Sequence, residues 1–278
     1  MSHASAVSAM RVQGMFLESL LADDVDKTRR RAMTASLDRV VIQMARRLAP
    51  EVVLEIGAHD AWFSARMRRV LPNTRVIAFE ANPEVHAQGA DRLRGLGVDF
   101  RNQAVSDATG QVTSMVPRGA RSKSRRDMGS LLRRKGEVDE QTFEVDAVRL
   151  DDAPGVDGAS NIMWIDVEGA VGMVLDGAPE TLAKSELIYV ELEPREDWPG
   201  QRIDVDIIDA LARHGLVPVL RDVQRRVGQY NALFLRETRI GEPFVERSIR
   251  RFVAELTAPR TAQDAAQADS SPPDAAAD

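Results

Sequence analysis

Two residues that could hold a nucleoside follow the first two strand-like runs of the chain. Gly57 closes the run EVVLEIG and opens the turn LEIGAHDAWF. A glycine at such a turn lets the backbone approach a ligand closely, and the helix that follows offers free N–H groups. Glu80 closes the second run, TRVIAFE, where a carboxylate can accept hydrogen bonds from both hydroxyls of a ribose. Together the two residues predict a nucleoside site.

The turn lacks the glycines that a dinucleotide site would need. A GxGxxG sequence uses its later glycines to admit a pyrophosphate and to pack the helix closely. In this chain His59 and Trp62 occupy those positions. The turn therefore favours a nucleoside without a pyrophosphate, and S-adenosylmethionine is the commonest such cofactor. A nicotinamide-dependent oxidoreductase is the disfavoured alternative.

Four carboxylates form a second group of side chains that could take part in a reaction. Asp166 and Glu168 follow one strand-like run, and Glu191 and Glu193 end another. Because side chains alternate along extended backbone, the members of each pair point to the same side. We expect Asp166 to orient or deprotonate an acceptor hydroxyl, with Glu168 supporting it. No spacing here is diagnostic of Mg²⁺, so we predict no metal site.

The histidines add no second site. They are too scattered in sequence to indicate a metal cluster, and only His59 falls at the predicted cofactor turn. The tryptophan and phenylalanine of that turn, Trp62 and Phe63, are expected mainly in the core. The four histidines are His3, His59, His86 and His214.

Strand-like and helix-like segments alternate along the chain. Short apolar runs predict strands at residues 51–57, 74–80, 98–105, 162–169, 186–194, 216–222 and 231–237. Three- and four-residue apolar spacing predicts helices at 36–49, 61–71, 83–96, 171–182 and 203–214. Asn82 is expected as the N-cap of one helix and Pro83 as its first residue. This order predicts an α/β fold, a doubly wound and mostly parallel sheet with helices on both faces.

Three segments lie outside this alternation. Residues 1–35 are expected to be a helical leader to the domain at 36–257. A basic loop at 118–135 interrupts that domain, and QTFEVDAVRLDD behind it alternates like a strand. Residues 258–278 are Ala-, Asp- and Pro-rich with no large apolar side chain, so we expect a disordered tail.

Composition narrows the functional classes. The net charge of −6, from 37 basic and 43 acidic residues, gives no global attraction to nucleic acid or anionic membrane. No run of about 18 apolar residues predicts a membrane span. There is no cysteine, which excludes disulfides and thiolate ligands. We expect a cytoplasmic protein that binds neither nucleic acid nor membrane.

Beyond these single signals, five motifs together resemble the FkbM family of S-adenosylmethionine-dependent methyltransferases. VVLEIGAHDAWFS, VIAFEANPE, FRNQAVSD, MGSLL and WIDVEGA occur in the family's order and spacing. The resemblance implies a Rossmann-like class I methyltransferase fold. It also implies O-methylation of a hydroxyl on a glycan or secondary-metabolite acceptor.

The same resemblance implies the residues of the cofactor site. The glycine turn and the acidic end of the second strand would bind the cofactor, and two residues would lie beside adenine. MGSLL is similar to a family segment that lies over the acceptor pocket. The implied cofactor residues are Glu55, Gly57, Ala58, His59 and Glu80, with Gln103 and Ala104 at adenine.

The chain departs from the family pattern at three positions. Trp164 replaces a lysine and Val171 a glutamate in the strand-four motif, and Ala61 replaces a glycine in the turn. These changes keep a second hypothesis open, a non-catalytic nucleoside-binding protein of the same fold. The basic loop could receive an anionic acceptor, or it could simply be solvated.

Overall fold

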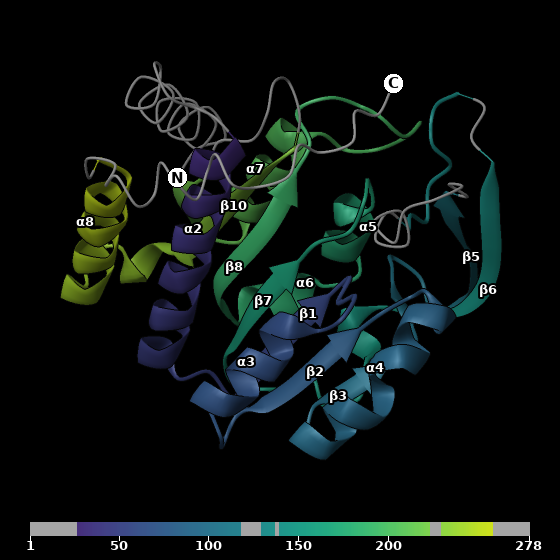
Figure 1. The fold of residues 1–278 in the computed structure, drawn as a ribbon, viewed down its shortest axis with the longest axis horizontal. Coiled ribbons are helices and arrows are strands. Elements are labelled where there is room, and N and C mark those ends of the chain that lie inside the picture. Colours follow the sequence, from purple (N-terminus) through teal and green to yellow (C-terminus); the bar gives the residue numbers. More distant parts are fainter. Residues whose placement is uncertain (1–26, 118–128, 137–138, 223–228, 258–278) are drawn as a thin grey trace.

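A seven-stranded sheet forms the centre of the molecule (Figure 1). The computed structural model describes residues 27–117, 129–136, 139–222 and 229–257. The strand order is β3-β2-β1-β7-β8-β10-β9. The strands are β1 (Val52–Ile56), β2 (Arg75–Phe79), β3 (Asp99–Arg101), β7 (Asn161–Ile165), β8 (Ser185–Leu192), β9 (Leu216–Arg221) and β10 (Tyr230–Arg236). All neighbours pair in parallel except β10, which is antiparallel to β8 and β9.

Helices cover both faces of this sheet, which confirms the predicted doubly wound α/β architecture. On one face lie α2 (Lys27–Leu48), α3 (Trp62–Val70), α4 (Pro83–Leu96) and α8 (Pro243–Thr257). On the other face lie α5 (Val171–Asp176), α6 (Pro179–Ala183) and α7 (Asp204–Arg213). Each face therefore has its own apolar core.

Strand β1 shows how the sequence divides its side chains between these cores. Val52, Leu54 and Ile56 pack into the core under α5 to α7, and Val53 packs into the core under α2 and α3. All five residues of the strand are buried. A parallel strand covered on both faces meets no water, so its residues are apolar except Glu55, which is buried with a hydrogen-bond partner.

The start and end of α4 confirm the prediction made from its capping residues. The Asn82 side chain accepts hydrogen bonds from the N–H groups of Glu84 and Val85, and Pro83 is the first helical residue. Gly97 ends the helix at a φ of 77°, a left-handed conformation that favours glycine. These caps fix where the chain leaves β2, and so they fix the neighbourhood of Glu80.

The expected strand at residues 98–105 is in fact two strands in different sheets. β3 joins the main sheet, whereas β4 (Ala104–Val105) belongs to a small sheet with the order β4-β6-β5. Between them the Asn102 side chain donates to the carbonyls of Glu80 and Ala81. These bonds hold the chain as it leaves the main sheet. The small sheet is completed by β5 (Gly110–Pro117) and β6 (Glu140–Val148), and β6 includes most of the predicted alternating segment.

Two helix expectations also need adjustment. The helix expected at 171–182 is divided into α5 and α6, because the chain turns at Gly177 and Pro179 begins a new helix. Helix α2 begins at Lys27, so both sides of the boundary proposed at 35/36 lie in one helix. The parts of the leader, basic loop and tail at 1–26, 118–128 and 258–278 lie outside the described residues.

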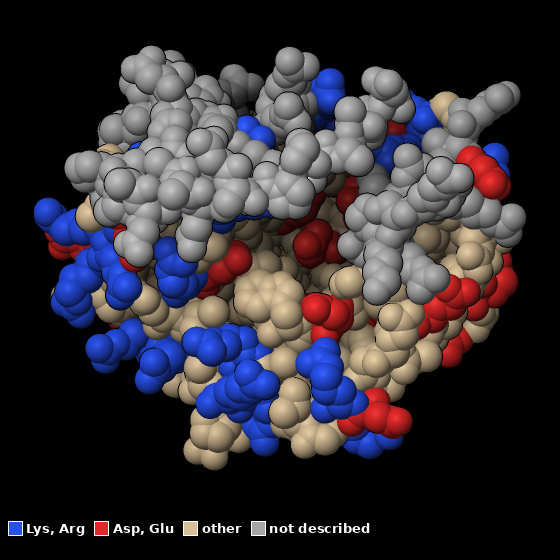
Figure 2. All heavy atoms as spheres, viewed as in Figure 1, with Lys and Arg blue, Asp and Glu red and all other residues tan. Residues whose placement is uncertain are grey.

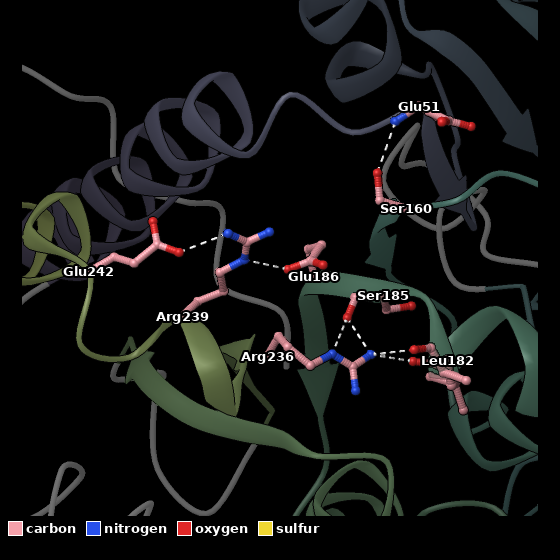
Figure 3. A network of polar contacts seen from close by, with 9 residues as sticks. Glu51, Ser160, Leu182, Ser185, Glu186, Arg236, Arg239 and Glu242 are labelled. Carbon is pink, nitrogen blue, oxygen red and sulfur yellow. Dashed lines mark hydrogen bonds and ion pairs between the residues drawn. The ribbon is translucent and has the colours of Figure 1, made fainter.

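Arg236 of β10 connects the start of β8 to the ends of the neighbouring helices through hydrogen bonds (Figure 3). The Arg236 guanidinium donates to the carbonyl oxygens of Ser185, Leu182 and Ala183, at 2.5 to 3.1 Å, and also to that of His214. These carbonyls stand at the ends of α6 and α7 and the start of β8. Helix ends leave carbonyls without intrahelical partners, and Arg236 satisfies several at once.

Candidate active site

A cleft opens where the parallel strands β1, β2 and β7 end. In Figure 2 acidic side chains gather inside the hollow at the centre of the face shown. We call this the cofactor cleft. Its lining residues are Ile56, Gly57, His59, Phe79, Glu80, Ala81, Asn82, Gln103, Ala104, Val105, Ser114, Gly129, Ser130, Leu131, Asp166, Val167, Glu168 and Ala170.

Gly57 lies where the turn after β1 passes against the end of β7. Its φ is 76°, and a Cβ built on it would stand 1.9 Å from the carbonyl oxygen of Asp166. No side chain fits there without moving the backbone. The close approach brings the two predicted site elements, the glycine turn and the strand-four motif, into direct contact.

The rest of the turn is held in a conformation that is unusual for its residues. His59 and Ala61 have φ values of 47° and 51°, in the left-handed region where non-glycine residues are strained. The N–H groups of Gly57 and Ala58 both donate to the Phe79 carbonyl at the end of β2. This bonding helps to offset the strain and engages the N–H of Ala58.

Glu80 joins the end of β2 to the turn. One carboxylate oxygen accepts the His59 N–H at 2.7 Å and the other accepts the Asn82 N–H at 2.7 Å. Burial raises the pKa of Glu80, and these two backbone hydrogen bonds oppose the shift. Each carboxylate oxygen can accept more than one hydrogen bond, so the residue keeps capacity for ribose hydroxyls.

The opposite wall of the cleft comes from MGSLL and the start of the small sheet. Gly129, Ser130 and Leu131 line it beside Gln103 and Ala104. The Ser130 hydroxyl donates to the Glu168 carbonyl at 2.7 Å, which ties this wall to the strand-four motif. The segment thus lines the cleft on the side of the small sheet.

The four carboxylates singled out in the sequence lie together at the ends of β7 and β8. Asp166 is exposed in the cleft, and it accepts a hydrogen bond from the carboxyl group of Glu191. Burial, followed by the charges of Asp166 and Glu168, raises the pKa of Glu191 well above its ordinary value. Such a pair retains a shared proton more readily than two isolated acids do.

Glu168 and Glu193 extend this cluster. Burial raises the pKa of Glu168 to about 7, and the charges of Glu193 and Asp166 add to the shift. Burial also raises the pKa of Glu193 to about 7. The Gln229 amide donates to Glu168 at 3.0 Å and the Gly169 N–H donates to Glu193 at 3.2 Å. Groups that change protonation near neutral pH are suited to proton transfer.

Two of the residues assigned to the cofactor site lie apart from the lining of the cleft. Glu55 is fully buried and accepts the Ser64 N–H of α3 at 2.7 Å. Burial raises its pKa to about 8. Ala58 is 3% exposed and faces the core. In the described part of the chain, both residues support the turn from behind.

Other cleft residues carried no sequence signal for this role. Asn82 was assigned only as a helix cap, yet its N–H holds Glu80 and it lines the cleft. Gln229, which precedes β10 and is not among the lining residues, donates to Glu168 from a distant part of the sequence. Among the described residues, no three Asp, Glu or His side chains are arranged to hold a metal ion.

The aromatic residues near the turn differ from expectation in one case. Phe63 is buried as expected, whereas Trp62 is 42% exposed at the first residue of α3. Trp164, at the position of the family's lysine, is 5% exposed and stacks on Tyr189 with ring centroids 3.7 Å apart. Val171 is buried in the core under α5.

Comparison with known proteins decides the family. Residues 55–217 match the model of the Methyltransferase FkbM domain. The chain belongs to the FkbM methyltransferase family. The 2-O-methyltransferase NoeI of Sinorhizobium fredii (strain NBRC 101917 / NGR234) is 26% identical to this FkbM protein over 212 residues, 72% of this chain and 87% of NoeI.

Solved structures of methyltransferases are also similar to this FkbM protein. Precorrin-6y C5,15-methyltransferase from Geobacter metallireducens GS-15 is 16% identical, with a TM-score of 0.40, over 71% of this chain and 87% of that one. Magnesium protoporphyrin IX methyltransferase (ChlM) from Synechocystis PCC 6803, solved with bound SAM, is 10% identical, with a TM-score of 0.43, over 79% and 88%.

The family makes this protein a methyltransferase with S-adenosylmethionine as its cofactor, as the sequence predicted. The oxidoreductase and the non-catalytic binding protein are therefore not favoured. The cleft suits this cofactor, because the Glu80 carboxylate can accept hydrogen bonds from hydroxyls and Gly57 lets the backbone approach closely. No helix in the described ranges is long and apolar enough to span a membrane.

Proposed function

We propose that this FkbM methyltransferase transfers a methyl group to a hydroxyl of a glycan or a related small-molecule acceptor. NoeI, a 2-O-methyltransferase by name, supports an oxygen acceptor. The main structural support is the Asp166 carboxylate, exposed in the same cleft as Glu80 and beside three further acids. A hydroxyl nucleophile benefits from such an acceptor for its proton.

One end of the cleft would bind the cofactor, and the other would bind the acceptor. Glu80 accepts hydrogen bonds from the ribose, Gln103 and Ala104 border the adenine, and Gly57 and His59 form the floor between them. When bound, S-adenosylmethionine supplies an electrophilic methyl group on a sulfonium sulfur. The cleft must hold that methyl in line with the acceptor oxygen, because orientation contributes much of the rate in displacement reactions.

Asp166 would act on the acceptor. Its carboxylate accepts a hydrogen bond from the acceptor hydroxyl and takes the proton as the oxygen–methyl bond forms and the sulfur–methyl bond breaks. Its contact with Glu191 offers a second position for that proton. Glu168 supports Asp166 electrostatically and is itself held by Gln229.

A methyl-transfer assay tests this function. Purified protein is incubated with S-adenosylmethionine carrying a labelled methyl group and with methyl pyranosides, phenols, amines and carboxylates. We expect base-stable label on the pyranoside hydroxyls. Label on amines alone, or cofactor binding without transfer to any of these acceptors, would contradict the proposal.

Two narrower proposals concern the surroundings of the site. The basic loop at 118–135 would admit an anionic acceptor. In its described part Lys135 pairs with Glu196 at 2.8 Å, and the Arg134 guanidinium lies 5.4 Å from the Trp198 ring centroid. Neutralising Arg121, Lys123, Arg125 and Arg126 should then raise the KM for anionic acceptors only. A cytoplasmic location is proposed too, and cell fractionation tests it.

A further inference from the structure

Trp62 is exposed in a way that the fold does not require. The chain has three tryptophans, and Trp164 and Trp198 are 5% and 3% exposed, whereas Trp62 is 42% exposed. Leaving a large aromatic ring in water forgoes about 1.5–3 kcal/mol of burial free energy. Trp62 begins α3, three residues after His59 in the wall of the cofactor cleft.

Buried aromatic neighbours hold the Trp62 ring in one orientation. It meets Trp164 edge to face, with centroids 5.2 Å apart and planes at 85°, and it meets Phe63 at 6.0 Å and 78°. Trp164 is itself fixed by stacking on Tyr189. A ring held in this way loses little conformational entropy on binding, which favours its use as a binding surface.

The aromatic group and the carboxylates lie in register on neighbouring strands. Trp164 pairs with Tyr189 across β7 and β8. Asp166 and Glu191 each follow two residues later and so point to the same side as their aromatic predecessors. Two residues along a strand span about 6.6 Å. The exposed Trp62 ring contacts Trp164, which lies two residues before Asp166, so the ring and the acidic pair belong to the same end of the sheet.

We infer that Trp62 is the platform for one pyranose ring of the acceptor, whose hydroxyl edge faces Asp166. A pyranose presents C–H groups on its face and hydroxyls on its edge. The face of an indole ring carries partial negative charge and attracts polarised C–H groups, while a carboxylate accepts hydrogen bonds from hydroxyls. The inference rests on the proposed function and narrows it to a pyranoside with an uncharged apolar face.

Fluorescence gives a test that does not require turnover. Acrylamide quenching is measured with S-adenosylhomocysteine present and a panel of methyl pyranosides added. Because the other two tryptophans are buried, quenching reports mainly on Trp62. We expect at least one pyranoside to protect the fluorescence. If no pyranoside protects it, or if only planar phenols do, the inference is wrong.

Steady-state kinetics then distinguish the platform role of Trp62 from the proposed O-methyltransferase function. Trp62→Ala should raise the KM for the pyranoside about tenfold with the affinity for S-adenosylhomocysteine unchanged, and Trp62→Phe should restore part of the loss. Ile240→Ala is the matched control, since Ile240 is also 42% exposed, and it should behave as wild type. Unchanged KM in Trp62→Ala, with methylation intact, refutes the platform alone. Methylation of no hydroxyl refutes the proposed function.

Discussion

The backbone N–H of His59 donates to the Glu80 carboxylate at 2.7 Å. This bond joins the turn after β1 to the end of β2, although the two residues come from different loops. It orients the carboxylate toward the cleft lined by Gly57 and Asp166. This side of the cleft is therefore organised by backbone contacts to Glu80.

Gly57 should tolerate no side chain. In Gly57→Ala the new Cβ would collide with the Asp166 carbonyl, and φ would remain in the left-handed region. We expect about 3 kcal/mol or more of lost unfolding free energy, together with loss of S-adenosylhomocysteine binding. Gly95→Ala is the control, because nothing lies within 4 Å of a Cβ built at this position in the last turn of α4. It should gain less than about 1 kcal/mol. Equal urea denaturation midpoints for the two variants would contradict this account.

Asp166→Asn should impair the chemical step without affecting cofactor binding. The amide cannot take the hydroxyl proton, so kcat should fall about 10²- to 10⁴-fold while S-adenosylhomocysteine affinity stays within about threefold. Steady-state kinetics and calorimetry measure the two quantities. Asp157→Asn, at a side chain that is 84% exposed, should have no effect. A kcat near wild type in Asp166→Asn would remove Asp166 from the reaction.

The acidic cluster predicts a pH profile. Burial raises the pKa values of Glu168 and Glu193 to about 7. If Glu168 supports proton transfer as a carboxylate, the rate should rise with pH through about 7. Glu193→Gln removes a neighbouring negative charge, so the midpoint should move to lower pH. A midpoint that stays in place in this variant would exclude the coupling.

The same two shifts predict how stability depends on pH. Between pH 4.5, the ordinary pKa of glutamate, and about 7 the folded protein holds protons that the unfolded chain releases. The free energy of unfolding should therefore fall as the pH rises through this window. Urea denaturation at several pH values measures it, and rising stability across the window would be the contrary result.

Arg236 should contribute to stability through the helix ends that it caps. Arg236→Ala leaves carbonyls of α6 and α7 without their charged donor, and we expect a loss of about 2–3 kcal/mol. Arg250→Ala removes an exposed pair with Glu246, side chains 77% and 65% exposed, and should cost less than about 0.5 kcal/mol. Thermal denaturation compares them. Equal losses would mean that the Arg236 contacts are not stabilising.

Local patterns predicted the parts of this fold that depend on neighbouring residues. The apolar runs gave the sheet, and Asn82 with Pro83 gave the start of α4. Contacts between distant residues decided the rest. Asn102 diverts the chain after β3 through carbonyls of another loop. Helix α8 was not expected, although Val245, Phe252 and Leu256 bury one face of it.

In the candidate site, too, some features were predictable from local sequence and others depend on tertiary contacts. Strand ends predicted that Gly57, Glu80 and Asp166 meet at one edge of the sheet, and all three line the cleft. The burial of Glu55 behind the turn and the contact of Gln229 with Glu168 depend on tertiary packing. The exposure of Trp62 likewise depends on Trp164, from a strand distant in sequence.

The most direct test of the central claim is the affinity of S-adenosylhomocysteine for Glu80→Ala, measured by calorimetry at neutral pH. Loss of charged hydrogen bonds to the ribose should weaken binding about 10- to 100-fold. Glu84→Ala, an exposed acid in the first turn of α4, should bind as wild type does. If folded Glu80→Ala binds within about twofold of wild type, Glu80 does not hold the ribose and the cofactor site is wrongly assigned.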